Sequence, residues 1–249
     1  MNKLLCLSLL ILLIENFAIS QNKATQSVVV EYQHYRSPRT SPFIIDYKSY
    51  LQANSDESTY EIYLSEIDSS RSIINDKGSH TMLYEKNNSY YYKNFENGYL
   101  INREKILMKK FYIEDGIDLF DWELKNEKKE ILGHECKRAE VSFRGDRYIA
   151  YYAPDVPISN GPWKFHGLPG LILDVRSADN IFRLIAKSIE FANENLEIIK
   201  PYQDKKIISR AEFEALYKKK YNEVNRYNEE GVTFKMSKGA IEIIVTDDN

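Results

Sequence analysis

The sequence predicts a mainly β protein of the α+β class, built on an antiparallel sheet with one helix near the C-terminus. Three observations lead to this fold class. The 249-residue chain holds 19 Tyr and 11 Phe against only 10 Gly and 7 Pro, and aromatic side chains suit the half-buried surface of a sheet. Apolar and polar residues alternate with a period of two in several short segments, as in strands with one buried face. No helices alternate with these segments, which argues against a parallel α/β design.

Residues 1–20 have the features of a secretory signal peptide. Lys3 supplies the positive start, residues 4–14 form an apolar core, and Ala18 and Ser20 are the small residues that a signal peptidase requires. We expect cleavage between Ser20 and Gln21 and export to the periplasm, with secretion beyond it as an open alternative. The apolar core is too short to cross a bilayer, so no membrane span is expected.

Residues 21–249 are expected to form a single β-rich domain. Cys136 is the only cysteine in this part of the chain, so no disulfide can form within the domain. A formal net charge of −3 and a pI near 5.9 argue against a general nucleic-acid or anionic-membrane binder, which would need a basic surface. The lysine clusters at residues 205–206 and 218–220 have acidic neighbours and are interpreted as a solvated helix face.

The first half of the domain reads as a meander of antiparallel strands. Alternating residues predict strands at 28–33, 45–52 and 60–64. Two further strands, at 89–95 and 99–103, flank Asn97-Gly98, and Asn-Gly is the strongest short signal for a hairpin.

The second half continues the pattern. A charged turn is expected at residues 126–129, followed by a strand through Ala139 and Val141. Gly145-Asp146 is expected to form a two-residue turn with glycine first, and the returning strand at 147–153 ends at Pro154. A surface loop then leads to a hairpin of two strands at 171–175 and 181–189.

One helix interrupts the strands near the C-terminus. Ser209 followed by Glu212 makes a capping box at a helix start. The helix is expected to run for about 15–18 residues, and it can pack across the concave face of the sheet. Its apolar stripe is expected to hold Phe213, Leu216, Tyr217, Tyr221 and Val224. Residues 241–246 are expected to form a last strand.

Four segments of the second half carry a family resemblance. They are Ile131-Leu132-Gly133-His134-Glu135-Cys136, Tyr152-Ala153-Pro154, Gly161-Pro162-Trp163-Lys164-Phe165 and Gly167-Leu168-Pro169-Gly170-Leu171-Ile172. Together with the signal peptide, they make the chain similar to the GLPGLI family, exported proteins of Bacteroidetes named for the last six residues. The resemblance implies no established activity and no cofactor. For the fold it implies a strongly curved antiparallel sheet or half-barrel, like that of the periplasmic lipoprotein carriers.

The signature itself has a local explanation. Pro169 presets φ and Gly170 accepts a positive φ, so residues 168–171 are expected to form a type II turn that starts a strand buried on both faces. A functional interpretation stays open beside this structural one. In that interpretation Trp163, Phe165 and His166 lie at the rim of the curved sheet, where a loop crosses its mouth, and bind a ligand there.

Other residues offer little chemistry. His134 and Cys136 lie two apart on a presumed strand and so share a face, which could activate a thiolate. The sequence shows neither a group to orient the histidine nor an oxyanion site, and a lone cysteine is more often a small buried hydrophobe. The remaining histidines lack the short spacings of a metal site, so no catalytic residue, metal or cofactor is assigned.

Three functions are weighed on these grounds. The preferred hypothesis is a non-enzymatic periplasmic binding or carrier protein for an apolar or peptide ligand, because Tyr and Trp suit sites that are half wet. The second is an envelope adaptor that docks to an outer-membrane protein through an exposed strand edge. The third is a hydrolase that uses Cys136 with His134. Nucleic acid is not expected as a partner.

Overall fold

The computed structural model describes residues 27–36, 45–63, 71–75, 78–82, 89–192, 196–200 and 202–226. The expected signal peptide at residues 1–20 and the expected last strand at 241–246 lie outside these residues. The assignment of residues 21–249 to one domain stays a prediction.

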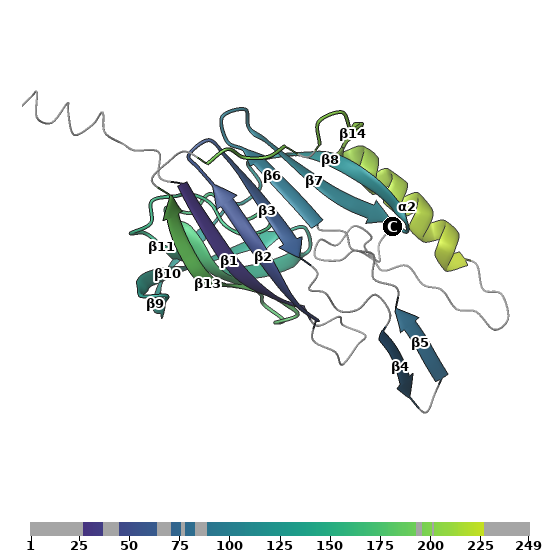
Figure 1. Ribbon diagram of the computed structural model, residues 1–249, viewed down its shortest axis with the longest axis horizontal. Coiled ribbons are helices and arrows are strands. Elements are labelled where there is room, and N and C mark those ends of the chain that lie inside the picture. The colour runs from purple at the N-terminus through teal and green to yellow at the C-terminus, as the bar shows by residue number, and fades with distance from the viewer. Residues whose placement is uncertain are drawn as a thin grey trace, which may run out of the picture.

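The described chain folds mainly into one large curved sheet with a helix near the C-terminus (Figure 1). The sheet has twelve strands in the order β14-β8-β7-β6-β3-β2-β1-β13-β12-β11-β10-β9, and all neighbours are antiparallel except β14 and β8. The mainly β fold class is therefore confirmed. The strands of the sheet are β1 (Ser27–Arg36), β2 (Ile45–Ala53), β3 (Glu57–Tyr63), β6 (Ser89–Asn94), β7 (Tyr99–Ile106), β8 (Lys109–Gly116), β9 (Glu123–Ile131), β10 (His134–Phe143), β11 (Asp146–Ala153), β12 (Leu171–Ser177), β13 (Phe182–Ala192) and β14 (Ile207–Ser209). β4 (Arg71–Asn75) and β5 (Gly78–Met82) form a separate hairpin.

Two meanders are joined at the middle of the sheet. β1 pairs with β13 over ten residue pairs, from Ser27 with Ala192 to Arg36 with Phe182. This long-range pairing places the first described strand at the centre of the sheet, where Val28, Val30 and Tyr32 have no exposed surface. The outer strands of the sheet are β9 at one end and β14 beside β8 at the other.

The sheet curves around the side chain of Trp163. The ring centroid of Trp163 lies 6.2 Å from that of Tyr91 on β6 and 6.1 Å from that of Phe143 on β10. Seven strand spacings of about 4.8 Å separate β6 from β10 along the sheet, so in a flat sheet they would lie roughly 30 Å apart. A single side chain can contact both strands only from inside the curve, so Trp163 lies on the concave side.

The helix forms where the capping residues predict it. α2 (Arg210–Arg226) has 17 residues, and the Ser209 hydroxyl accepts a hydrogen bond from the Glu212 backbone N–H at 3.1 Å. Phe213 and Tyr217 are buried against Ile106 and Ile113 of β7 and β8. β14, with only three residues, is too short to show a period of its own and was not predicted.

Two turns differ from the prediction. The reversal after β10 uses Arg144 and Gly145, whose φ angles of 47° and 86° are both positive, as a type I′ turn requires. Glycine is therefore the second turn residue, and Asp146 already begins β11. The Asn97-Gly98 hairpin is confirmed, but its loop has four residues, because Asn94 pairs with Tyr99.

The predicted charged turn at residues 126–129 is wrong. These residues belong to β9, which pairs with β10 and has a register shift where Lys128 pairs with Lys137 and Leu124 with Ala139. β9 has a neighbour on one side only, and most of its side chains are exposed. An edge strand of this kind has no buried face to impose alternation, and its charges discourage pairing with other chains.

Candidate functional site

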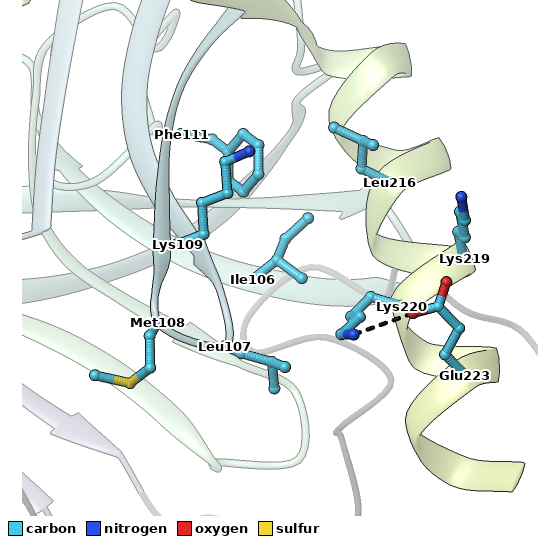
Figure 2. A pocket seen from close by; sticks show the side chains of 9 residues that line it. All are labelled: Ile106, Leu107, Met108, Lys109, Phe111, Leu216, Lys219, Lys220 and Glu223. Atoms are coloured by element: carbon cyan, nitrogen blue, oxygen red, sulfur yellow. Dashed lines mark hydrogen bonds and ion pairs between the residues drawn. The ribbon is translucent and has the colours of Figure 1, made fainter. Parts of the chain in front are cut away.

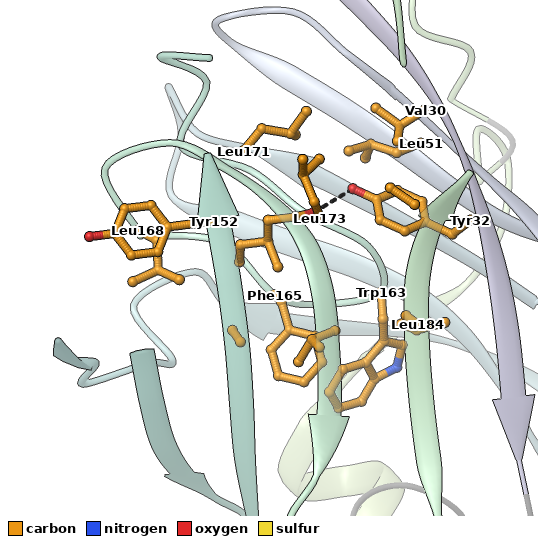
Figure 3. Close-up of a cluster of buried hydrophobic side chains, with 14 of the residues drawn as sticks. Val30, Tyr32, Leu51, Tyr152, Trp163, Phe165, Leu168, Leu171, Leu173 and Leu184 are labelled. Carbon is orange, nitrogen blue, oxygen red and sulfur yellow. Dashed lines mark hydrogen bonds between the residues drawn. The ribbon is translucent and has the colours of Figure 1, made fainter. Parts of the chain in front are cut away.

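The three predicted ligand-binding residues lie inside the protein. They belong to residues 154–170, called the motif loop below, which connects β11 to β12 on the concave side of the sheet. Trp163 is 2% exposed, Phe165 is fully buried and His166 is 8% exposed. The expectation that they lie at a rim is wrong, because the loop folds into the curve and its aromatic rings fill it (Figure 3).

The turn at Pro169-Gly170 also differs from the prediction. The Gly170 N–H donates to the Leu168 carbonyl at 2.8 Å, which closes a three-residue turn around Pro169, and the Leu171 N–H donates to the Val156 carbonyl at 3.0 Å. The φ of Gly170 is +150°, whereas a type II turn has about +80° at this position. Glycine is needed at position 170 because the backbone passes Ala153 closely. A Cβ there would lie 2.2 Å from the Ala153 carbonyl oxygen, and φ is +150°.

The strand that follows is buried on both faces, as predicted. Leu171, Ile172 and Leu173 have no exposed surface. The Ile172 N–H donates to the Asn160 carbonyl at 2.9 Å, and the Tyr32 hydroxyl of β1 donates to the Ile172 carbonyl at 2.6 Å. These contacts join the motif loop to the centre of the sheet.

A buried lysine anchors the motif loop from the other half of the sheet. Lys93 on β6 has no exposed surface, and its ammonium donates to Asn160 Oδ1 at 2.7 Å, the Gly161 carbonyl at 2.7 Å and the Phe165 carbonyl at 2.9 Å. The three donors of the ammonium are therefore all used. Burial lowers the pKa of Lys93 well below its usual value, and these three acceptors stabilise the charged form.

The end of the motif loop is held by further polar contacts. His166 Nδ1 lies 2.7 Å from the Lys164 carbonyl oxygen, and Nε2 lies 2.6 Å from the Ile117 carbonyl oxygen. Burial, and then the Lys93 charge, lower the pKa of His166 to about 4. The Trp122 indole N–H donates to the His166 carbonyl at 2.8 Å. These contacts all hold the motif loop in place, so the loop is a packed structural element.

Cys136 and His134 do not form a nucleophilic pair. The Cys136 thiol is buried and donates to the His134 backbone carbonyl at 3.6 Å, and not to the imidazole. Burial, and then the charge of Asp155, raise the pKa of the thiol to about 12, so it stays protonated near neutral pH. His134 Nδ1 lies 2.7 Å from Asp155 Oδ2. Among the described residues, no group of three or more His, Cys, Asp or Glu could hold a metal ion.

The structure places an open apolar groove at the other end of the molecule, between the β7–β8 turn and α2 (Figure 2). Its volume is about 520 Å³. Three of its apolar side chains are exposed, namely Met108 at 78%, Leu107 at 39% and Leu216 at 37%. The groove is lined by Ile106, Leu107, Met108, Lys109, Phe111, Leu216, Lys219, Lys220 and Glu223.

This groove is not predicted by any pattern in the sequence. β8 was not predicted, so Leu107 and Met108 could not be placed in the turn before it. Lys219 and Lys220 were interpreted as a solvated helix face, whereas the structure puts them on the groove beside apolar side chains. Leu216 belongs to the apolar stripe expected of the helix, and the structure leaves it 37% exposed on the groove.

Comparisons with known proteins address the fold. A family model described as "Protein of unknown function (Porph_ging)" matches residues 144–174, which include the whole motif loop. No curated protein matches the chain. Two structures of PNGF-II, in space groups C2 and P21, are similar to it with TM-scores of 0.50 and 0.52 and sequence identities of 17% and 15%.

The PNGF-II match covers 79% of this chain but only 33% and 34% of the two PNGF-II chains. This chain therefore spans about a third of the length of those structures. At such identities the likeness concerns the fold alone. Among the described helices, none combines the length and the apolar character that a membrane crossing needs.

Proposed function

We propose that the protein is a non-enzymatic binding protein that holds an apolar segment of a partner protein in the groove between the β7–β8 turn and α2. The observation that carries this proposal is the meeting of exposed Leu107, Met108 and Leu216 in one hollow. Isolated exposed apolar residues are ordinary, whereas several gathered in a concavity are typical of a binding site.

The concave side of the sheet is the less suitable place for a ligand. Carriers with curved sheets need an open interior, and here Trp163 and Phe165 fill the part of the curve between β6 and β10. The buried thiol of Cys136 likewise disfavours a hydrolase. A binding role at the groove needs neither an empty interior nor an activated nucleophile.

The PNGF-II comparison supports a modular role. In those structures the similar fold accounts for about a third of a longer chain, so the rest of that chain accompanies the sheet. We propose that the present chain also works together with another protein, which it contacts through its groove.

Methionine methyl NMR tests the groove directly, because the chain has only four Met and Met108 is 78% exposed. The probe is the neutral heptapeptide acetyl-Ser-Ile-Thr-Leu-Thr-Val-Ser-amide. We expect it to shift the Met108 methyl signal in the mature protein and in Leu124→Glu, an exposed position on β9 at the opposite edge of the sheet. Leu216→Glu should abolish the shift. A Met108 signal that the peptide leaves unchanged contradicts the proposal.

Export is part of the proposal and has its own test. Sequencing the N-terminus of protein recovered from a periplasmic fraction should find Gln21 as the first residue, as the sequence of residues 1–20 predicts. Protein that keeps residues 1–20 and stays in the cytoplasm would refute export while leaving the groove proposal intact.

A further inference from the structure

The β7–β8 turn presents two large apolar side chains where tight turns favour other residue types. Ile106 pairs with Lys109, so Leu107 and Met108 alone form the loop, and Leu107 has a φ of 54°. A positive φ is costly for a bulky side chain, and two-residue hairpin loops therefore favour Gly, Asn and Asp. Leu107 and Met108 are nevertheless 39% and 78% exposed. Since neither the backbone nor the core requires them, their presence indicates a role in binding.

Cys136 and Met108 place their sulfur atoms in opposite surroundings. The Cys136 thiol is buried, and its raised pKa keeps it protonated. The Met108 side chain lines the groove (Figure 2) and is the most exposed large apolar side chain among the described residues. The protein therefore shields a thiol in its core and offers a thioether to solvent at its binding groove.

An exposed thioether reacts with a hydroperoxide by oxygen transfer. The sulfur lone pair forms an S–O bond with one peroxide oxygen while the O–O bond breaks. With hydrogen peroxide, the proton on the transferred oxygen moves to the departing hydroxide, which leaves as water. Sulfur is oxidised by two electrons and the peroxide is reduced by two. The product, methionine sulfoxide, is polar where the thioether is apolar, and methionine sulfoxide reductases reverse the reaction.

We propose that Met108 is an oxidation site through which a hydroperoxide switches off binding at the groove. This inference rests on the proposed function, because it concerns the regulation of that same site. In the reduced state, Met108 adds apolar contact surface beside Leu107 and Leu216. In the oxidised state, the sulfoxide oxygen is hydrated in the free protein, and an apolar segment that covers it removes that water without replacing its hydrogen bonds. The oxidised groove therefore releases the segment, and reduction restores binding.

The test treats the full mature chain with hydrogen peroxide and uses a fluorescein-labelled form of the neutral heptapeptide described above as the probe. Peptide mapping by mass spectrometry should find Met108 converted to the sulfoxide in the folded protein. Fluorescence polarisation should then show the probe binding at least about fivefold more weakly, because a polar oxygen is covered by an apolar segment. Methionine sulfoxide reductases for both epimers should restore the affinity. Unchanged affinity after full conversion of Met108 overturns the inference.

Three variants assign the effect to Met108. Met108→Leu removes the sulfur but keeps an apolar side chain, so its affinity for the probe, whatever its own value, should not change on peroxide treatment. Met108→Gln gives a side chain of similar length a polar end, and it should bind the probe at least about fivefold more weakly without any peroxide. The matched control Met82→Leu on β5 should bind as the parent does and keep its sensitivity to peroxide. A peroxide effect that persists in Met108→Leu overturns the inference.

Two further measurements keep the test decisive. In a time course of oxidation, the loss of affinity should follow the conversion of Met108 and not that of Met82. Because the turn is exposed, oxidation of Met108 should change Tm by less than about 2 °C, as a surface substitution does. A loss of affinity that follows Met82, or that appears only with a large fall in Tm, overturns the inference.

The outcomes also separate this inference from the proposed function. If the reduced protein does not bind the neutral heptapeptide, both proposals fail. If the reduced protein and the protein with oxidised Met108 bind it alike, the groove is a binding site but the switch is wrong. If peroxide oxidises Met108 in the unfolded chain and leaves it intact in the folded protein, the thioether is not accessible and the inference is again overturned.

Discussion

Lys93 should hold the motif loop in place, and replacing it by methionine should loosen the loop. Lys93→Met keeps the length of the side chain but removes its three donors. The acceptors Asn160 Oδ1, Gly161 O and Phe165 O then lose the ammonium that lies 2.7–2.9 Å from them, inside a region that excludes water.

The magnitude follows from two opposing terms. Asn160 Oδ1 keeps the Gly161 N–H at 2.8 Å, so the Gly161 and Phe165 carbonyls are the two acceptors left unsatisfied. An unsatisfied buried acceptor costs about 1–3 kcal/mol, so the two together cost roughly 2–6 kcal/mol. Removing the ammonium also removes its desolvation penalty, which amounts to several kcal/mol for a buried ion. We therefore expect a net loss of about 1–3 kcal/mol in the free energy of unfolding, which corresponds to a fall in Tm of roughly 2–12 °C for a domain of this size.

Urea unfolding and amide hydrogen exchange measure the two parts of this prediction. The midpoint of unfolding should fall. Protection should decrease at the Leu171 and Ile172 amides, whose acceptors are the Val156 and Asn160 carbonyls of the motif loop. Lys128→Met is the matched control, because Lys128 makes an exposed ion pair with Glu135, and it should change stability by less than about 0.5 kcal/mol.

A small effect would refute the reasoning. If Lys93→Met lowers stability by less than about 1 kcal/mol and leaves the two amides protected, the aromatic packing alone holds the loop. The buried lysine would then be tolerated by the fold and not required by it.

Three other predictions concern Gly170 and His166 of the motif loop and Cys136 of β10. Gly170→Ala should destabilise the protein by more than about 2 kcal/mol in urea, because its Cβ would lie 2.2 Å from the Ala153 carbonyl oxygen; unchanged stability would contradict that close approach. The pKa of His166, about 4 in the folded state against about 6.5 unfolded, means that only the unfolded state gains a proton as pH falls through this window. The free energy of unfolding should therefore fall by about 3 kcal/mol from pH 6.5 to 4. His166→Gln should remove this pH dependence, whereas the control His134→Gln should keep it. Cys136, with a pKa raised to about 12 by burial, should resist thiol labelling near pH 8 until the protein is unfolded; rapid labelling of the folded protein would show an accessible thiolate.

The fold could be predicted where local rules act on strands with one buried face. Val28, Val30 and Tyr32 alternate in burial with Val29, Glu31 and Gln33 because one face of β1 is buried, and Ser209 caps α2 because its hydroxyl satisfies a helix N–H. β9 was mistaken for a turn because both of its faces are polar. The pairing of β1 with β13 depends on residues about 150 positions apart, and no local pattern encodes it.

The candidate site could not be predicted for a related reason. Trp163 and Phe165 are residue types that occur both in binding surfaces and in cores. Which of the two they form depends on the curvature of the sheet, which brings β6 and β10 to either side of them. The groove arises from a turn and a helix separated by about 100 residues, with Met108 on one and Leu216 on the other. Each residue alone reads as an ordinary exposed hydrophobe.

The motif loop explains why a distinctive signature need not mark an active site. A domain requires a second packed layer over each apolar sheet face, and in this protein α2 covers only the β7–β8 end of the concave side. The Trp163 and Phe165 rings supply that layer from a loop, and Gly170 allows the loop to return beside Ala153 at the start of β12. Because the motif loop forms this packed layer, it tolerates few substitutions, whichever segment the protein binds. Differences in binding specificity should therefore arise at surfaces such as the groove, where substitutions of Met108 and Lys219 leave the core intact.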